Sequence, residues 1–186
     1  MKEIEILVEV FENEETVLNA LKSYFFSGEK LVIDTYYYDP LRPNLKPNSD
    51  NQLTECLRLR TMAEQVFITY KVDRFNENGL WLYSDELETQ IESPQIIAQI
   101  LEKMGLKELI TIKNLKRIYK FENYEIVFEK VEDLGLYLEV EFCTDKNVSI
   151  LEVKKEIQGF IDKLKLKLSP ELNIGKPEMM LRKKKS

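Results

Sequence analysis

Apolar and polar residues alternate along the start of the chain. The apolar series is Ile4, Ile6, Val8 and Val10, and the intervening series is Glu3, Glu5, Leu7 and Glu9. Successive side chains of a β-strand point to opposite faces, so this spacing predicts a strand over residues 2–10. One face of that strand is apolar and needs a hydrophobic core, whereas the other carries three carboxylates.

Similar patterns predict seven further strands and three helices. The strands are expected over residues 31–39, 53–61, 66–72, 80–89, 110–121, 124–131 and 137–144. Apolar residues at helical spacing predict helices over 14–26, 94–104 and 150–168. Asn13 suits the cap of the first helix and Gly28 its end, while Pro94 suits the first turn of the second. Three prolines within residues 40–47 predict an irregular loop.

The order of these elements predicts the fold class. Consecutive strands are mostly close enough for hairpins, which favours an antiparallel α+β fold over strict strand–helix alternation. Eight such strands predict a closed or nearly closed β-barrel in a single domain over residues 1–186. The amphipathic helices need an apolar surface, which the apolar rows of the strands supply. We therefore expect the helices outside the barrel and the charged strand faces around its lumen.

The overall charge excludes some classes of function. The 186 residues include 27 basic and 33 acidic residues, a formal net charge of −6, which argues against a general nucleic-acid binder. No stretch approaches the ~18 apolar residues of a membrane span, and the N-terminus lacks the apolar core of a signal peptide. We therefore expect a cytoplasmic protein that binds neither nucleic acid nor membrane.

Residue types restrict the chemistry further. The chain contains no histidine, which excludes His-based triads and imidazole zinc sites. Any catalysis must then use carboxylates, Lys, Tyr or a metal. Cys56 and Cys143 lie in alternating apolar runs and are expected to be reduced core residues rather than a disulfide. The basic run over residues 182–185 is expected to be a solvated tail.

The charged strand faces carry both signs of charge. The acidic set is Glu3, Glu5, Glu9, Glu86, Glu88, Glu129, Glu139 and Glu141, and the basic set is Arg58, Arg60, Lys71 and Lys116. A solvated outer face would make all of them surface residues. If they line a lumen instead, carboxylates at alternate positions suit Mg²⁺ or Mn²⁺. Arginines at the same spacing suit phosphate oxygens. The inward arrangement therefore predicts a site for a metal and a polyphosphate.

These residues occur in the order of known sequence motifs. The motifs are Glu3-x-Glu5, Leu57-Arg58-Leu59-Arg60, Thr69-Tyr70-Lys71, Glu86-x-Glu88, Lys116-x-x-Tyr119, Glu129 and Leu134-Gly135-x-x-Leu138-Glu139-Val140-Glu141, with the Tyr-rich run that begins at Asp34. Together they resemble the CYTH superfamily, the triphosphate tunnel metalloenzymes. This superfamily includes class IV adenylyl cyclases, thiamine triphosphatases and inorganic triphosphatases. The resemblance covers the chain from Glu3 to about Asp145.

The resemblance implies an eight-stranded antiparallel tunnel that binds a small-molecule triphosphate with a divalent metal, Mg²⁺ or Mn²⁺. By position, the phosphate-binding residues would be Arg58, Arg60, Lys71 and Lys116. The metal-binding residues would be Glu3, Glu5, Glu129, Glu139 and Glu141, with Glu86 and Glu88 in supporting roles. The implied activity is turnover of a nucleoside, thiamine or inorganic triphosphate, by hydrolysis or by cyclisation.

Several positions depart from the family pattern and motivate an alternative. Leu7 stands where the family has a lysine, Ser84 where it often has an arginine, and Asn114 where it has a lysine. Lys116 replaces an arginine, and Lys176-Pro177 stands in place of Ser-Tyr near the C-terminus. The alternative is a polyphosphate-binding or nucleotide-binding module with a decayed active site. A barrel for an apolar ligand is opposed by the charged inner face. The oligomeric state stays open, with a homodimer among the alternatives.

Overall fold

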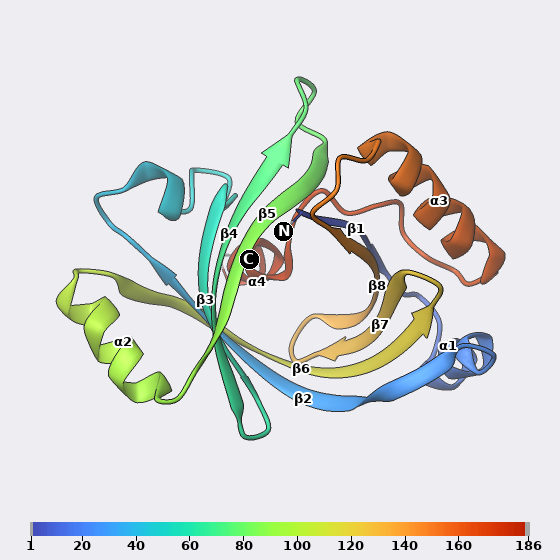
Figure 1. Cartoon of the computed structure of the whole chain (residues 1–186), viewed down its shortest axis with the longest axis horizontal. Coiled ribbons are helices and arrows are strands. Elements are labelled where there is room, and N and C mark those ends of the chain that lie inside the picture. Colours follow the sequence, from blue (N-terminus) through green and yellow to red (C-terminus); the bar gives the residue numbers. More distant parts are fainter. Residues whose placement is uncertain (1, 185–186) are drawn as a thin grey trace.

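The computed structural model describes residues 2–184 as eight strands, four α-helices and one short 3₁₀ helix (Figure 1). The strands are β1 (Lys2–Glu9), β2 (Phe25–Tyr38), β3 (Glu55–Met62), β4 (Gln65–Phe75), β5 (Trp81–Ile91), β6 (Lys107–Phe121), β7 (Tyr124–Val131) and β8 (Gly135–Thr144). The helices are α1 (Glu14–Leu21), η1 (Pro43–Leu45), α2 (Pro94–Lys103), α3 (Ile150–Lys163) and α4 (Lys176–Lys183). None of the described helices is long and apolar enough to cross a membrane.

All eight strands form a closed antiparallel barrel, which confirms the predicted fold class. The strand order is β1-β5-β4-β3-β2-β6-β7-β8, and β8 pairs back to β1 along eight residues (Figure 1). The seam between β1 and β5 is much shorter, because it consists of the pairs Lys2 with Asp85 and Glu3 with Ser84. Beyond Glu3 the two strands separate, so another segment has to satisfy the backbone of β1 there.

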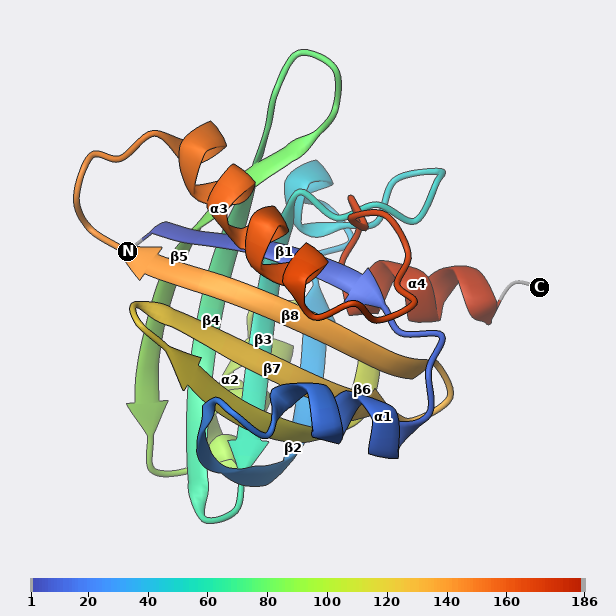
Figure 2. The ribbon, with the colours of Figure 1, turned by 90° about the vertical axis from the view of Figure 1, so that its right-hand side faces the viewer.

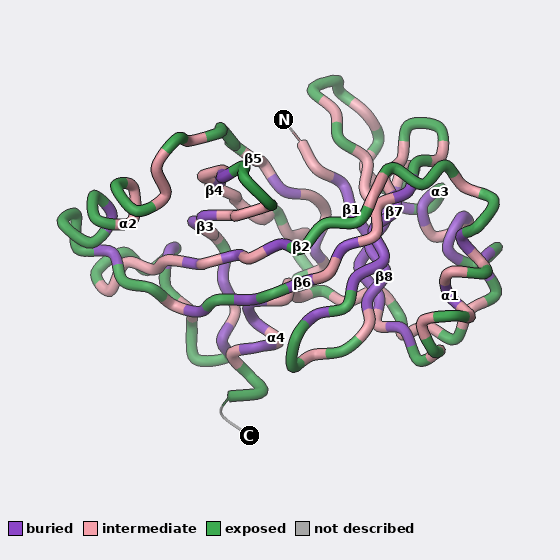
Figure 3. The backbone as a smooth tube through the Cα atoms, turned by 90° about the horizontal axis from the view of Figure 1, so that it is seen from below, coloured by how far each residue is buried: buried purple, intermediate pink, exposed green. Residues whose placement is uncertain are grey.

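The apolar row of the first strand lies outside the barrel, beneath two helices. Ile4, Ile6 and Val8 are buried with Val17 of α1 and Ile157 of α3 in the largest hydrophobic cluster. Figure 2 shows α3 lying across β1 and β8, and Figure 3 shows the buried positions concentrated in this part of the chain. The alternation of the sequence therefore places the apolar rows under the helices and turns the charged rows inward, as predicted.

A second outer cluster lies under α2. Leu57 and Leu59, on the outer face of β3, are buried with Leu101 of α2 and Leu106. Pro94 occupies the first turn of α2, and the Ser93 side chain accepts a hydrogen bond from the Ile96 backbone N–H. A serine cap followed by proline fixes the start of the helix, so the sequence locates this boundary correctly.

The first helix is shorter than its apolar spacing predicts. It ends at Leu21, and β2 begins at Phe25, so that Gly28 lies within the strand and does not end the helix. Gly28 has a φ of +146° and marks an irregularity in the pairing of β2 with β6. Tyr24 continues the apolar spacing, but its ring packs edge-on against Phe121 of the barrel. Tertiary packing therefore overrides the helical periodicity here.

The segment that follows α3 runs beside β1 where β5 has separated from it. The helix ends at Lys163, earlier than predicted, and residues 164–175 continue in extended and turn conformations. The Leu172 backbone N–H donates to the Leu7 carbonyl at 2.8 Å, and the Trp81 backbone N–H donates to the Asn173 side chain at 3.2 Å. These bonds bridge the split seam and guide the chain to one end of the barrel.

The helix α4, which the sequence interpretation did not predict, closes that end of the barrel. Arg182 and Lys183 lie in this helix, and Lys184 is its C-terminal cap, so these three residues are not an irregular tail; Lys185 lies outside the described residues. Met180 is buried against Leu7 on the inner face of β1, in a cluster with other inward-facing apolar side chains. Figure 2 shows α4 against the end of the barrel. The fold therefore has one covered end.

The outer core makes a stability prediction. Ile157 of α3 is fully buried against the barrel, so Ile157→Ala is expected to lower the free energy of unfolding by about 2–5 kcal/mol through a cavity beneath the helix. Leu151, in the same helix, is 66% exposed, and Leu151→Ala is expected to change stability by less than about 0.5 kcal/mol. Urea denaturation of both variants checks this, and equal effects would contradict the packing described.

Candidate functional site

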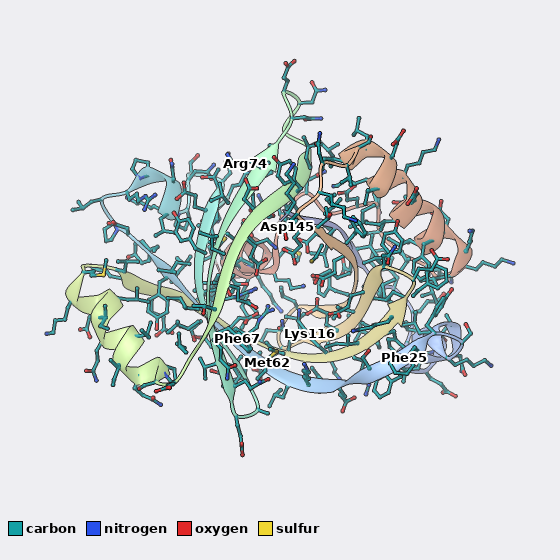
Figure 4. The ribbon with its side chains drawn as sticks, viewed as in Figure 1. Phe25, Met62, Phe67, Arg74, Lys116 and Asp145 are labelled. Carbon is teal, nitrogen blue, oxygen red and sulfur yellow. The ribbon has the colours of Figure 1, made fainter. Side chains whose placement is uncertain are left out.

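The barrel encloses a cavity of about 280 Å³ lined mainly by the inward strand faces. Its lining includes every site residue predicted from the sequence except Glu129, which is fully buried on the same inward face of β7 as Glu125 and Val127. Figure 4 labels one of them, Lys116 of β6, on the inner side of the barrel wall. Residues that are far apart in the sequence thus meet in one space.

The acidic wall of the cavity is formed by β1 and β8. The antiparallel register places Glu5 opposite Glu141 and Leu7 opposite Glu139. Carboxylate oxygens of Glu5, Glu139 and Glu141 lie within 4.8 Å of one another. Alternate positions on two adjacent strands therefore place three carboxylates on one surface patch of the lumen.

These three carboxylates fit a divalent cation. Mg²⁺ binds oxygen ligands at roughly 2.1 Å, which puts opposite ligands about 4.2 Å apart, so small side-chain adjustments would bring the three oxygens around one ion. Burial and nearby carboxylates raise the pKa of Glu5 to about 8 and raise the pKa of Glu141 well above its usual range. A cation bound between them would remove this repulsion.

The basic wall lies opposite, on β3, and is held by a buried aspartate. Arg60 donates two parallel hydrogen bonds to Asp34 of β2, at 2.8 and 2.9 Å, and Arg58 Nε lies 3.9 Å from the same carboxylate. Burial would raise the pKa of Asp34, but the charges of Arg60 and Arg58 override it and hold this pKa well below its usual range. Asp34 therefore stays ionised and fixes both guanidinium groups in the lumen.

Arg58 also connects the basic wall to β4 and β5. Its Nη2 donates to the Thr69 hydroxyl at 3.2 Å and lies 3.6 Å from carboxylate oxygens of both Glu86 and Glu88. Thr69 in turn donates to Glu88 at 2.8 Å. Glu86 lies in the wall of the cavity, whereas Glu88 is at its more exposed rim. Both residues thus serve as partners of lumen cations in the structure.

Lys71 bridges the acidic and basic walls. Its ammonium forms an ion pair with Glu3 and lies 3.7 Å from Glu5 and 3.9 Å from Glu86. Burial opposes ionisation of Glu3, but the Lys71 charge lowers the pKa of Glu3 to about 2. Burial and the Glu3 charge raise the pKa of Glu86 to about 7. One lysine therefore neutralises Glu3 fully and its two other neighbours only in part.

A second lysine group lies deeper in the barrel. Lys116 is 3.7 Å from Glu129 and 4.0 Å from Glu139, and Asn114 donates to Glu129 at 3.2 Å. Lys176, at the start of α4, forms ion pairs with both Glu129 and Glu139. Burial opposes ionisation of Glu139, but the charges of Lys176 and Lys116 hold its pKa well below its usual range. Glu129 is thus surrounded by nitrogen donors, and it shares Lys116 and Lys176 with Glu139, one of the three clustered carboxylates.

Lys176 is the main site residue that sequence reasoning missed. It was noted only as a departure from the family's C-terminal motif, yet its side chain is 11% exposed and points into the lumen. The signal was present in Gly175-Lys176-Pro177-Glu178, because glycine, proline and an acidic residue in this order are typical of a helix start. Lys30 and Glu125, which line the opposite mouth, were missed as well.

The two cysteines differ in how far they match the predicted core placement. Cys56 is half-buried and Cys143 is exposed, and both are free thiols on the cavity wall. Burial and the charge of Glu141 raise the pKa of Cys143 to about 12. The predicted core placement is wrong for Cys143, which is exposed, whereas Cys56 packs against the buried inner cluster that contains Leu7 and Met180.

Comparison with known proteins decides the family. The family model described as "CYTH domain" matches residues 1–170 of the chain. The chain belongs to the CYTH family. The match includes the whole barrel and α3, and it ends before α4.

Relatives of similar length support this assignment. The Methanocaldococcus jannaschii protein named "Putative adenylate cyclase MJ0240" is 30% identical over 187 residues, which cover 98% of this chain and 99% of that protein. The PH1012 protein of Pyrococcus horikoshii has a TM-score of 0.77 at 25% identity, covering 95% of this chain and 98% of its own. The PH1819 protein of the same organism has a TM-score of 0.80 at 22% identity, covering 96% and 99%. This CYTH chain therefore shares its fold with the two Pyrococcus horikoshii proteins over nearly its full length.

Glu178, next to the lumen, makes a prediction about pH. Its carboxylate accepts the Leu53 backbone N–H at 3.3 Å, and burial raises its pKa from 4.5 to about 7. Between these values the folded protein holds a proton that the unfolded chain has lost, so this stabilisation is present at low pH and is lost as the pH rises through 7. Glu178→Gln keeps a neutral acceptor, and we expect its melting temperature to exceed that of the wild type by a few degrees at pH 8 but not at pH 5.

Thermal unfolding followed by circular dichroism at both pH values checks this expectation. Glu64, in the exposed turn between β3 and β4, provides the matched control, and Glu64→Gln should leave the melting temperature unchanged at either pH. A Glu178→Gln variant less stable than the wild type at pH 8 would contradict the assigned protonation.

Proposed function

We propose that this CYTH protein binds a triphosphate-containing substrate together with Mg²⁺ or Mn²⁺ inside its barrel and turns the substrate over. The observation that carries the proposal is the division of one cavity into two walls. Glu5, Glu139 and Glu141 form a cluster suited to a hard divalent cation. Arg58 and Arg60 project from the opposite wall with geometry suited to phosphate oxygens.

Each wall has a distinct role in the proposed site. Arg58, Arg60, Lys71 and Lys116 would bind and orient the phosphate chain, and Asp34 would keep the two arginines in place. Glu5, Glu139 and Glu141 would hold the metal, with Glu3 at the edge of the same wall, while Glu129 would act through the lysines that it contacts. When bound, the divalent ion supplies charge neutralisation for the phosphates. Fixed cations around the lumen then stabilise charge that develops on the leaving group.

One assay can determine both the substrate and the type of reaction. The panel is ATP, thiamine triphosphate and inorganic tripolyphosphate with Mg²⁺ or Mn²⁺, and the products to be measured are phosphate, pyrophosphate and cyclic AMP. Phosphate release identifies a hydrolase, whereas cyclic AMP with pyrophosphate identifies a cyclase. If none of these products forms, the proposed turnover is contradicted.

Two variants test whether catalysis occurs at this site. Arg58→Ala removes a buried phosphate-binding cation and Glu139→Ala removes a metal ligand, so each is expected to lower turnover by about a hundredfold or more. Arg74→Ala is the matched control, because Arg74 pairs with Asp85 on the exposed surface, and it should retain full activity. Turnover that survives both lumen substitutions would place the reaction elsewhere.

A second function, binding without turnover, has specific observations in its favour. Leu7, Ser84 and Asn114 place neutral side chains on the lumen wall or beside it, where the resemblance implies cations. Acidic residues accordingly outnumber basic ones among the residues that line the cavity. Calorimetry with tripolyphosphate and Mg²⁺, followed by product analysis over hours, separates the two functions. Binding with no product would establish the binding module.

Leu7→Lys discriminates between an active and a decayed site. Leu7 is 2% exposed and packs on Met180 of α4, and Lys176 already provides an ammonium to Glu139, the residue paired with Leu7. We therefore expect Leu7→Lys to lower the melting temperature by several degrees, because it buries a charge in an apolar cluster, without raising turnover more than about twofold. A large gain in turnover would indicate that position 7 lost a catalytic lysine.

A further inference from the structure

Trp81, the only tryptophan in the sequence, lies on the cavity wall beside the split seam of the barrel. Beyond the pair of Glu3 with Ser84, β5 separates from β1, and other segments bond the Trp81 backbone. Its N–H donates to the Asn173 side chain at 3.2 Å, and its carbonyl accepts from the Lys154 ammonium at 2.6 Å. These two bonds fix the backbone of Trp81, whose side chain is buried and lines the lumen.

Two polar residues hold the indole ring itself. The indole N–H of Trp81 donates to the Ser84 hydroxyl oxygen at 3.2 Å, and Ser84 donates to the Asp73 carboxylate at 2.7 Å. Ser84 is fully buried, so little water competes for these hydrogen bonds. Position 84 is one of those at which the resemblance implies a cation. In this chain it orients an aromatic ring instead.

The ring contacts Lys71, the cation that bridges the two walls. Lys71 Nζ lies 5.7 Å from the centroid of the Trp81 ring, within the ~6 Å at which an ammonium is attracted to the electron-rich face of an indole. The Lys71 side chain is 17% exposed, and this attraction is stronger where the cation is poorly hydrated. Carboxylates of Glu3, Glu5 and Glu86 lie near the same ammonium. Trp81 is thus an uncharged member of the group of side chains around Lys71.

An uncharged partner affects Lys71 differently from a carboxylate. A lysine has a flexible four-carbon stem, and a fixed ring beside the ammonium reduces the positions that it can occupy. A carboxylate restricts the ammonium as well, but it also neutralises the charge and competes with a phosphate for the N–H donors. The ring does neither. It therefore reduces the entropy that is lost when Lys71 binds a phosphate, without weakening the attraction.

We propose that Trp81 is a positioning residue whose indole ring, oriented by Ser84, holds the Lys71 ammonium in place for the phosphate chain. This inference rests on the proposed function and adds an uncharged determinant of affinity to it. Trp81 acts through Lys71 and makes no contact of its own with the substrate. Loss of the ring should therefore weaken phosphate binding only while Lys71 is present.

The first test separates the aromatic face of Trp81 from its bulk. Calorimetry of the intact chain with inorganic tripolyphosphate and Ca²⁺ compares Trp81→Phe, which keeps an aromatic face, with Trp81→Leu, which keeps only apolar volume. Both variants lose the indole N–H, so this loss cancels in the comparison. We expect Trp81→Leu to bind about tenfold more weakly than the wild type, and Trp81→Phe less than about threefold more weakly. Equal losses in the two variants would overturn the inference.

The matched control removes a similar contact from the outside of the barrel. Lys2 Nζ lies 5.3 Å from the centroid of the Tyr83 ring. Tyr83 is on the same strand as Trp81 but packs against the outer core cluster, so Tyr83→Leu should leave the affinity for tripolyphosphate unchanged. A loss as large as that of Trp81→Leu would assign the effect to general loosening of β5 and would overturn the role of Trp81.

A double-mutant cycle tests whether Trp81 acts through Lys71. Lys71→Met is expected to weaken binding by about tenfold or more, and Trp81→Leu added to it should weaken binding by less than about a further twofold. Full additivity of the two losses would contradict the inference. Lys71→Met leaves Glu3 buried without its cation, so the cycle is repeated with Glu3→Gln in every protein, and circular dichroism checks that each one is folded.

Ser84→Ala tests the support of the ring while the ring itself is kept. It removes the acceptor of the indole N–H, and it is expected to weaken tripolyphosphate binding by about threefold. An unchanged affinity would overturn the role of Ser84. A wild type that binds tripolyphosphate with neither Ca²⁺ nor Mg²⁺ would overturn the proposed function, and this inference with it. A wild type that binds it as tightly as Trp81→Leu does overturns the inference alone.

Discussion

Charge balance inside a closed barrel is the constraint on which the rest of this structure depends. An ionised side chain removed from water is tolerated when an opposite charge or several hydrogen bonds replace its hydration. Asp34 with two arginines, Lys71 with Glu3, and Lys176 with Glu129 satisfy this condition from different strands. Glu5 and Glu141, which lie beside Glu139, satisfy it less completely, because burial and nearby carboxylates raise the pKa of both; this is the physical reason to expect a cation in this cluster.

Buried backbone groups need partners as well, and this explains why the C-terminal segment belongs to the site. The short β1–β5 seam leaves backbone groups of β1 in need of partners, and residues 164–175 provide them. This route delivers α4 to one end of the barrel, where Met180 covers apolar residues and Lys176 supplies a charge. Residues 164–175 and α4 thus complete the wall beside β1, close one end of the barrel and place Lys176 in the lumen.

The neutral residues at family lysine and arginine positions are integrated into the structure. Leu7 contributes to the apolar closure with Met180, and Ser84 accepts the Trp81 indole N–H and donates to Asp73. Asn114 donates to Glu129. Each of the three thus has a packing or hydrogen-bonding role of its own. The strands therefore carry fewer basic residues towards the lumen than the family pattern has, and Lys176 of α4 adds a positive charge there.

The sequence alone determined the barrel and which residues line it. Side chains two positions apart on a strand point to the same face, and charged residues such as Glu5, Arg58 and Glu139 occur at that spacing. It could not determine α4, because this helix has only eight residues and packs through Met180 against inward-facing residues such as Leu7 and Ile112, which come together only in the closed barrel. Nor could it pair the charges, since the partners of Lys176 and Lys71 lie on strands far away in the sequence. Those pairings arise only when the strands close, because closure brings the inward faces within a few ångströms of one another.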